Sequence, residues 1–163
     1  MIKLLPLIIF SSLCFVATGV AQNKTIILVR HAEKVDASQD PELSSEGKQR
    51  AERLAKVVKK YKPGAIYSTD FKRTRDTAGP MAARRKLQVQ TYDPKNVSEL
   101  HDAIMKSKTK RFMIVGHSNT VPGLANLFGK KELFKNLDDS EYGAIWIVRI
   151  KDGRVKRTEV IPY

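Results

Sequence analysis

The chain has 163 residues, of which 42% are hydrophobic and 29% are charged, and this balance is typical of one globular domain with a sizeable core. Lysine and arginine outnumber aspartate and glutamate by 30 to 17, which gives a net charge of +13. The basic residues form short, scattered clusters without interleaved aromatic rings. This pattern argues against nucleic-acid binding and predicts a general attraction to small anionic substrates or to an anionic envelope.

The amino-terminal stretch, residues 1–21, predicts a signal peptide. One lysine precedes an almost entirely apolar run at 4–16, and Gly19-Val20-Ala21 is typical of a small-residue cleavage site. The run is short for a membrane-spanning helix, so we expect export to the periplasm or medium and no stable membrane insertion after cleavage. An uncleaved anchor is the alternative. Because Cys14 is the only cysteine, the predicted single domain, residues 22–163, has no disulfide and no thiolate metal site.

Strands and helices alternate through the predicted domain. Short apolar runs predict strands, and apolar residues at helical spacing predict helices. We expect strands at 26–30, 65–68, 87–92, 111–115, 143–150 and 155–160, and helices at 44–60, 71–85, from 98 onward and 121–128. Gly79-Pro80 should kink or interrupt the second helix. The alternation predicts an α/β fold, a three-layer sandwich whose mostly parallel sheet has helices on both faces and a C-terminal antiparallel hairpin.

Candidate functional side chains follow the strand ends. Arg30 and His31 end the first strand, and His117 follows the fourth. Because the carboxyl ends of parallel strands meet at one edge, where open α/β sheets bind ligands, these side chains should converge there. Arg73, in the first turn of the second helix, can point at the same place. Guanidinium forks beside a neutral imidazole suit phosphate chemistry. His101 lies inside a predicted helix and is expected to be a surface or packing residue.

Taken together, these segments resemble the histidine phosphatase superfamily, which also contains the cofactor-dependent phosphoglycerate mutases. Arg30-His31-Ala32-Glu33 resembles the opening Arg-His-Gly signature, with Ala32 in place of the usual Gly. Residues 43–51 are similar to the Leu-Thr-x-x-Gly-x-x-Gln-Ala segment, and residues 68–78 to the Ser…Leu-x-Arg-Ala-x-x-Thr-Ala segment. Val115-Gly116-His117-Ser118 is similar to the second-histidine strand end, and the segments follow one another in the family's order.

The resemblance implies phosphoryl transfer without a metal or cofactor. His31 would attack phosphorus and become a phosphohistidine, which water then hydrolyses. Arg30, Arg73 and His117 would surround the phosphate and stabilise its charge. A metal site built from His31 and His117 falls short of ligands. The nucleophile must be neutral, and cationic neighbours should lower its pKa.

The proton donor to the leaving oxygen stays open at this point. Asp93 matches by position the acid that many family members carry, and Glu33 is the rival. Some relatives that act on phosphohistidine and resemble this chain in size manage without such an acid. We therefore expect an exported phosphatase for a phosphomonoester or phosphoprotein. A phosphoglycerate mutase-type phosphotransferase and a catalytically inactive envelope-binding module are the alternatives.

Overall fold

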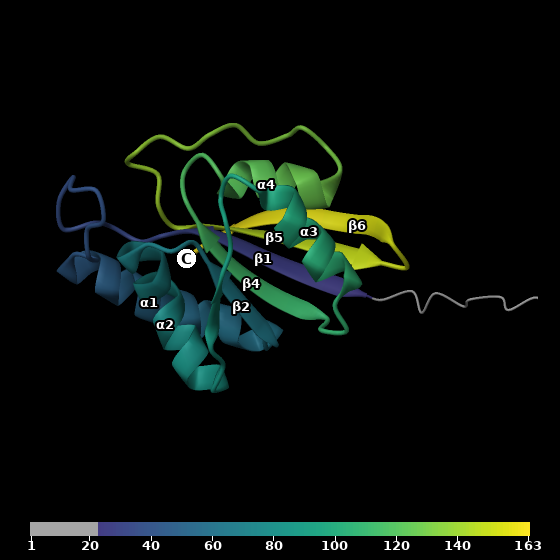
Figure 1. The fold of residues 1–163 in the computed structure, drawn as a ribbon, viewed down its shortest axis with the longest axis horizontal. Coiled ribbons are helices and arrows are strands. Elements are labelled where there is room, and N and C mark those ends of the chain that lie inside the picture. Colours follow the sequence, from purple (N-terminus) through teal and green to yellow (C-terminus); the bar gives the residue numbers. More distant parts are fainter. Residues whose placement is uncertain (1–22) are drawn as a thin grey trace, which may run out of the picture.

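The computed structural model describes residues 23–163, so the predicted signal peptide lies outside the described residues. Its centre is one six-stranded sheet in the order β3-β2-β4-β1-β5-β6 (Figure 1). The strands are β1 (Lys24–Arg30), β2 (Ala65–Ser68), β3 (Val89–Thr91), β4 (Arg111–Gly116), β5 (Ala144–Lys151) and β6 (Arg154–Pro162). The pairs β1–β4, β2–β4 and β2–β3 are parallel, whereas β5 runs antiparallel to β1 and β6 antiparallel to β5. The mostly parallel sheet and the C-terminal hairpin are confirmed.

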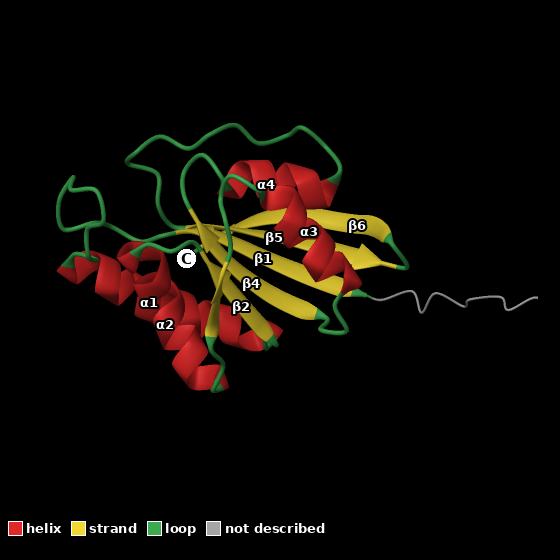
Figure 2. Ribbon diagram, in the orientation of Figure 1, coloured by secondary structure: helices red, strands yellow, loops and turns green. Residues whose placement is uncertain are grey.

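Helices cover both faces of this sheet, which confirms the three-layer arrangement (Figures 1 and 2). They are α1 (Ser45–Val58), followed by a short 3-10 turn (Lys59–Tyr61), α2 (Lys72–Arg85), α3 (Val97–Lys106) and α4 (Val121–Gly129). Alternate side chains of a strand point to opposite faces. Ile26 and Leu28 of β1 therefore pack in the core beneath α3 and α4, while Ile27 and Val29 pack beneath α1 and α2.

Helix α2 runs without a break through Gly79-Pro80, so the expected interruption was wrong. Proline removes one backbone donor from a helix. Buried Ala78, Met81 and Ala82 nevertheless pack in the core between α1, α2 and the sheet, and this packing holds the helix on both sides of the proline.

Strand β3 is shorter than the expected 87–92. Lys86 adopts a left-handed backbone conformation with φ of 54° at the end of α2. The Leu87 N–H then donates to the Ala82 carbonyl at 3.0 Å. Leu87 therefore belongs to the helix end.

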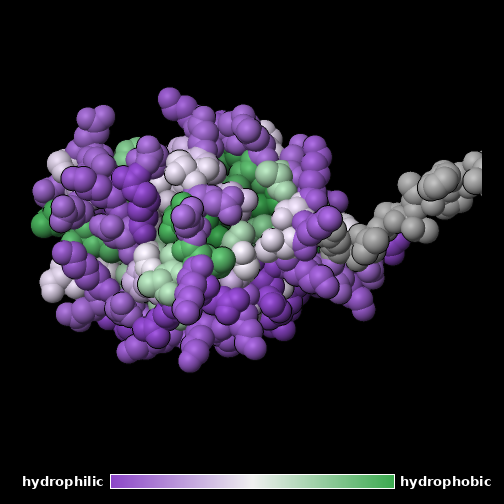
Figure 3. Space-filling model, turned by 60° about the horizontal axis from the view of Figure 1, so that its bottom comes forward, coloured by the Kyte–Doolittle hydropathy of each residue, from purple (hydrophilic) through white to green (hydrophobic). Residues whose placement is uncertain are grey.

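The surface is mainly hydrophilic. Hydrophilic residues cover most of the face in Figure 3, and apolar residues occupy patches between them. Among the described residues, the large hydrophobic side chains that are exposed are those of Val35, Leu127, Leu133 and Val160. No helix within residues 23–163 is long and apolar enough to cross a membrane.

The register of the parallel strands aligns the ends that carry the candidate residues. Arg30 pairs with Gly116 between β1 and β4, and Ser68 pairs with Val115 between β2 and β4. The residues that follow these positions thus leave three adjacent strands at one edge of the sheet.

Candidate active site

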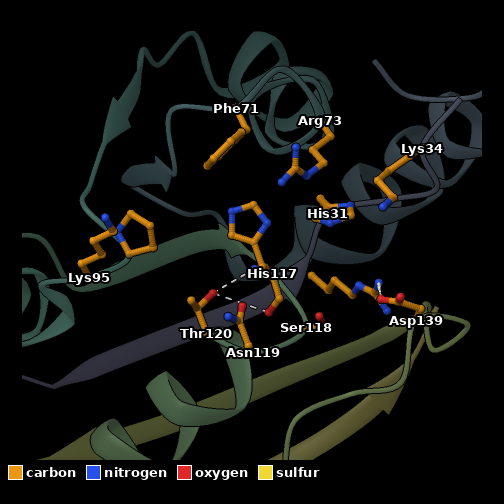
Figure 4. Close-up of a pocket in the computed structure, with 12 residues that line it drawn as sticks. His31, Lys34, Phe71, Arg73, Lys95, His117, Ser118, Asn119, Thr120 and Asp139 are labelled. Carbon is orange, nitrogen blue, oxygen red and sulfur yellow. Dashed lines mark hydrogen bonds and ion pairs between the residues drawn. The ribbon is translucent and has the colours of Figure 1, made fainter. Parts of the chain in front are cut away.

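A cavity of about 530 Å³ lies at this edge (Figure 4). It brings together four of the five predicted site residues, Arg30, His31, Arg73 and His117. Its lining carries four cationic side chains and one carboxylate, that of Asp139. The lining residues are Arg30, His31, Lys34, Phe71, Arg73, Pro94, Lys95, His117, Ser118, Asn119, Thr120 and Asp139. The cavity is therefore strongly electropositive, as an anion-binding site requires.

His31 is fixed by backbone contacts where the chain leaves β1. Its N–H donates to the Gly116 carbonyl at 2.9 Å, and the next N–H, of Ala32, donates to Thr77 Oγ1 at 2.9 Å. The imidazole Nδ1 lies 2.8 Å from the Ala32 carbonyl oxygen. Because a carbonyl only accepts, Nδ1 carries the proton, and a neutral ring then has its lone pair on Nε2. The side chain is therefore held as the tautomer that a nitrogen nucleophile needs.

His117 approaches His31 from the end of β4. The two ring centres are 5.4 Å apart in an edge-to-face arrangement. His117 Nε2 lies 2.9 Å from Thr69 Oγ1, which in turn lies 2.9 Å from Thr74 Oγ1. The Thr74 hydroxyl has the Thr69 and Phe71 carbonyls as acceptors, so it can accept from Thr69 while donating to one of them. Thr69 is a partner that sequence reasoning missed, although its place directly after β2 is a usable signal.

Both imidazoles are held neutral. Burial lowers the pKa of His31 to about 3, with His117, Arg30 and Arg73 adding to the effect and the hydrogen bond to Ala32 opposing it. Burial, followed by the charges of Arg73 and Arg30, lowers the pKa of His117 to about 4. At neutral pH the site thus presents uncharged imidazoles beside cationic guanidinium groups.

Arg30 is buried, with 4% of its surface exposed. Its Nη1 donates to the Asp138 carbonyl at 2.7 Å and to the Glu141 carbonyl at 2.8 Å. The Tyr142 ring packs on the guanidinium, with 4.2 Å between the ring centre and Cζ. Arg30 Nε is buried and has no hydrogen-bond partner within residues 23–163. A buried donor without a partner can donate a hydrogen bond to a bound anion.

Arg73 faces the same cavity from the first turn of α2. Its guanidinium packs 4.3 Å from the centre of the Phe71 ring, and Nη1 lies 3.9 Å from an Asp40 carboxylate oxygen. Burial lowers the pKa of Arg73, while Asp40 and Tyr142 oppose the shift. Its Nε is also buried without a partner in the described part of the chain.

The two candidate proton donors lie elsewhere. Asp93 does not line this cavity but a neighbouring hollow of about 310 Å³, and its Oδ1 accepts from the Lys95 N–H at 2.8 Å. The Glu33 carboxylate accepts from Arg50 Nε at 2.6 Å. Burial raises the pKa of Glu33, but the hydrogen bond and charge of Arg50 outweigh it, and the pKa is lowered.

Sequence reasoning also missed three charged residues of the cavity wall: Lys34, Lys95 and Asp139. His101 behaves as expected, since its ring packs 5.1 Å from that of Phe128, away from the cavity. Across residues 23–163, no group of three histidine, cysteine, aspartate or glutamate side chains is placed to hold a metal ion.

Comparison with known proteins finds a family match in the first part of the domain. The sequence model of the histidine phosphatase superfamily (branch 1) matches residues 26–95, from β1 to just past β3, including Arg30, His31 and Arg73. Over this segment the chain is similar to the histidine phosphatase superfamily. The second histidine of the site, His117, lies beyond the matched segment, and the fold brings it to the first. A search of curated proteins found no significant match.

Solved structures share the fold of this chain. The protein histidine phosphatase SixA in complex with tungstate has a TM-score of 0.68 at 17% identity, covering 85% of this chain and 96% of that one. The putative phosphohistidine phosphatase SixA from Agrobacterium tumefaciens has a TM-score of 0.64 at 18% identity, covering 86% and 99%. The mycobacterial glucosyl-3-phosphoglycerate phosphatase in complex with inorganic phosphate has a TM-score of 0.64 at 14% identity, covering 86% and 96%.

Proposed function

We propose that this protein is a metal-independent phosphatase that hydrolyses a small anionic phosphomonoester, or a phosphorylated protein side chain, through a phosphohistidine at His31. The observation that carries the proposal is the hydrogen bond from His31 Nδ1 to the Ala32 carbonyl, which leaves Nε2 free in a buried, cation-lined cavity. A neutral nitrogen beside guanidinium groups is the arrangement that nucleophilic attack on phosphorus needs.

The first step makes a bond from Nε2 to phosphorus with the nitrogen lone pair. The bond from phosphorus to the leaving oxygen breaks, and its electron pair departs with that oxygen. In the second step a water oxygen attacks phosphorus, the phosphorus–nitrogen bond breaks, and Nε2 regains its lone pair while the water proton passes to solvent. Arg30, Arg73 and His117 bind the oxygens on which charge is spread in both transition states.

The leaving group is expected to be one that departs easily. Asp139 is the one carboxylate of the cavity lining. Its side chain is 98% exposed and its Oδ1 lies 3.4 Å from Arg30 Nη2, so it is engaged by a cation and is poorly placed to assist a leaving oxygen. Aryl phosphates need little protonation of the leaving oxygen. The imidazole of a phosphohistidine can take its proton from solvent on the ring nitrogen remote from phosphorus and then departs as neutral imidazole, so this chemistry favours both over alkyl phosphates. The similar solved structures include one described as a protein histidine phosphatase and one described as a putative phosphohistidine phosphatase.

The test is phosphate release from 4-nitrophenyl phosphate with and without EDTA, for the wild type, His31→Ala and the matched control His101→Ala. We expect turnover that resists EDTA, persists in the control and disappears in His31→Ala. Turnover abolished by EDTA would refute metal independence. Absence of turnover in the wild type, with aryl phosphates and phosphoramidates alike, would favour the envelope-binding module.

Asp93 stays a candidate proton donor, and leaving-group dependence tests it. If Asp93 donates the proton, Asp93→Asn should slow hydrolysis of an alkyl phosphate far more than that of 4-nitrophenyl phosphate, because a good leaving group needs less assistance. Equal rates for wild type and variant on both substrates would exclude the role.

We also propose that the protein acts outside the cytoplasm. The proposal is supported by the apolar run at 4–16 and by Gly19-Val20-Ala21 after it. Fractionation of cells that express the full chain, with the amino terminus of the exported form sequenced, tests it. Full-length protein in the cytoplasm would contradict export.

A further inference from the structure

One wall of the cavity is built by residues 137–142, the segment before β5, which we call the strap. The Leu137 N–H donates to the Ser118 carbonyl at 3.0 Å, next to His117. At the other end of the strap, the Tyr142 ring centre lies 6.2 Å from that of His31. The strap therefore contacts the loops of both catalytic histidines, although more than a hundred positions separate it from the first.

Two hydrogen bonds between Asp138 and Glu141 close a turn within the strap. The Asp138 N–H donates to Glu141 Oε2 at 2.7 Å, and the Glu141 N–H donates to the Asp138 carbonyl at 3.0 Å. This turn aims the carbonyls of Asp138 and Glu141 at one atom, Nη1 of Arg30, at 2.7 and 2.8 Å. Two acceptors use both protons of Nη1.

These contacts fix the orientation of the Arg30 guanidinium. The Tyr142 ring packs on the guanidinium Cζ at 4.2 Å, and the arginine is almost fully buried. With Nη1 occupied, the donors left for a ligand are Nε, which is buried without a partner in the described residues, and Nη2. Nε and Nη2 form the fork that binds two oxygens of a phosphoryl group side by side.

We propose that the strap positions Arg30 for the phosphoryl group, with Tyr142 and Glu141 as positioning residues that do not touch the substrate themselves. The inference rests on the proposed function, in which Arg30 binds the transferred phosphoryl group. Stacking on Tyr142 and the turn closed by Glu141 hold the guanidinium before substrate arrives, so less conformational entropy is lost on binding.

Asp139, by contrast, competes with the phosphoryl group for Arg30. Its carboxylate lies 3.4 Å from Arg30 Nη2, its side chain is 98% exposed, and it lines the cavity (Figure 4). It therefore occupies one of the two free donors that the phosphoryl group needs. An exposed ion pair is weak, so an entering dianion displaces it at a small energetic cost.

The experiment measures tungstate binding by titration calorimetry at low salt, because tungstate mimics the phosphoryl group and its binding needs no turnover. Tyr142→Leu should weaken tungstate binding about tenfold, in line with the loss of a partly buried cation–π contact, and Tyr142→Phe should restore it. Glu141→Ala should weaken it about threefold or more by opening the turn, and Glu141→Gln, which still offers an acceptor oxygen, should restore it.

Asp139→Asn should tighten tungstate binding about two- to fivefold, because it removes the competing charge. The matched control is Asp152→Asn, which makes the same charge change in the β5–β6 turn, at the end of β5 away from the cavity, where asparagine tolerates the φ of 53°. We expect the control to match the wild type. A general effect of net charge would instead tighten binding equally in both variants, and that result would overturn the role of Asp139.

Two outcomes separate this inference from the proposed function. Wild-type tungstate affinity in Tyr142→Leu and Glu141→Ala, with phosphatase turnover present, would overturn the strap's role and leave the proposed function standing. The expected order of tungstate affinities in a protein that hydrolyses no phosphate compound would support the strap and refute the proposed function.

Discussion

Burial of a neutral His31 should make the stability of the folded protein fall steeply in acid. The pKa of His31 is lowered, chiefly by burial, from an ordinary value of 6.5 to about 3. Between these values the unfolded chain binds a proton that the folded chain does not. The stability is therefore fully present above about pH 6.5 and is lost progressively as pH falls toward about 3. From pH 7 to pH 4, at about 1.4 kcal/mol per pKa unit, this group alone lowers the free energy of unfolding by about 3 kcal/mol.

The assay is urea unfolding at pH 7 and pH 4, followed by the fluorescence of buried Trp146, for the wild type and His31→Gln. Carboxylates titrate in both proteins, so their contribution cancels in the comparison. The variant should lose about 3 kcal/mol less than the wild type between the two pH values, whereas the matched control His101→Gln should follow the wild type. If wild type and His31→Gln lose the same free energy to within about 1 kcal/mol, the reasoning is refuted.

Three further predictions concern kcat/KM for 4-nitrophenyl phosphate. Because the pKa values of His31 and His117 are lowered to about 3 and about 4, the pH profile, corrected for ionisation of the substrate, should show no loss centred near 6.5. Thr69→Val should lower kcat/KM about tenfold or more by leaving His117 Nε2 without its partner, and Thr69→Ser should restore it. Arg73→Lys should lower kcat/KM about tenfold to a hundredfold because an ammonium cannot reproduce the fork, whereas Arg75→Lys, outside the cavity, should have little effect. Unchanged kcat/KM in Thr69→Val or Arg73→Lys would contradict the geometry described for the site.

The sheet edge that carries the candidate site could be predicted because its residues follow locally recognisable strands and helices. His31 and His117 each follow an apolar strand, and parallel pairing of β1 with β4 brings any two such positions together. Arg73 lies in the first turn of α2, the helix that follows β2, and the same register places it at that edge. For these residues, strand periodicity and chain order suffice, and no knowledge of side-chain contacts is needed.

The surroundings of these residues could not be predicted in the same way. The partner of Arg30 lies 108 positions further along the chain, in an irregular segment with no hydrophobic period to fix its path. After β3 the chain forms a turn in which the Asp93 carboxylate accepts a hydrogen bond from the Lys95 N–H. Because of this turn, Pro94 and Lys95 line the cavity and Asp93 does not. Loop conformations of this kind are decided by hydrogen bonds that leave little trace in a single sequence.

The chemistry of the cavity depends on how its cations are satisfied. Carbonyl oxygens take both Nη1 protons of Arg30, whose carboxylate partner Asp139 is 98% exposed and 3.4 Å from Nη2. The carboxylate oxygen nearest to Arg73 Nη1 among the described residues is 3.9 Å away. A carbonyl dipole satisfies an N–H group without cancelling the charge that a carboxylate in close contact would neutralise. A positive field therefore remains in the cavity, where it attracts anions and adds to the lowering, mainly by burial, of the pKa values of His31 and His117. Attraction of a phosphate dianion and part of the cost of protonating the imidazoles thus come from the same arrangement, because the field that favours the dianion also disfavours a proton on the rings.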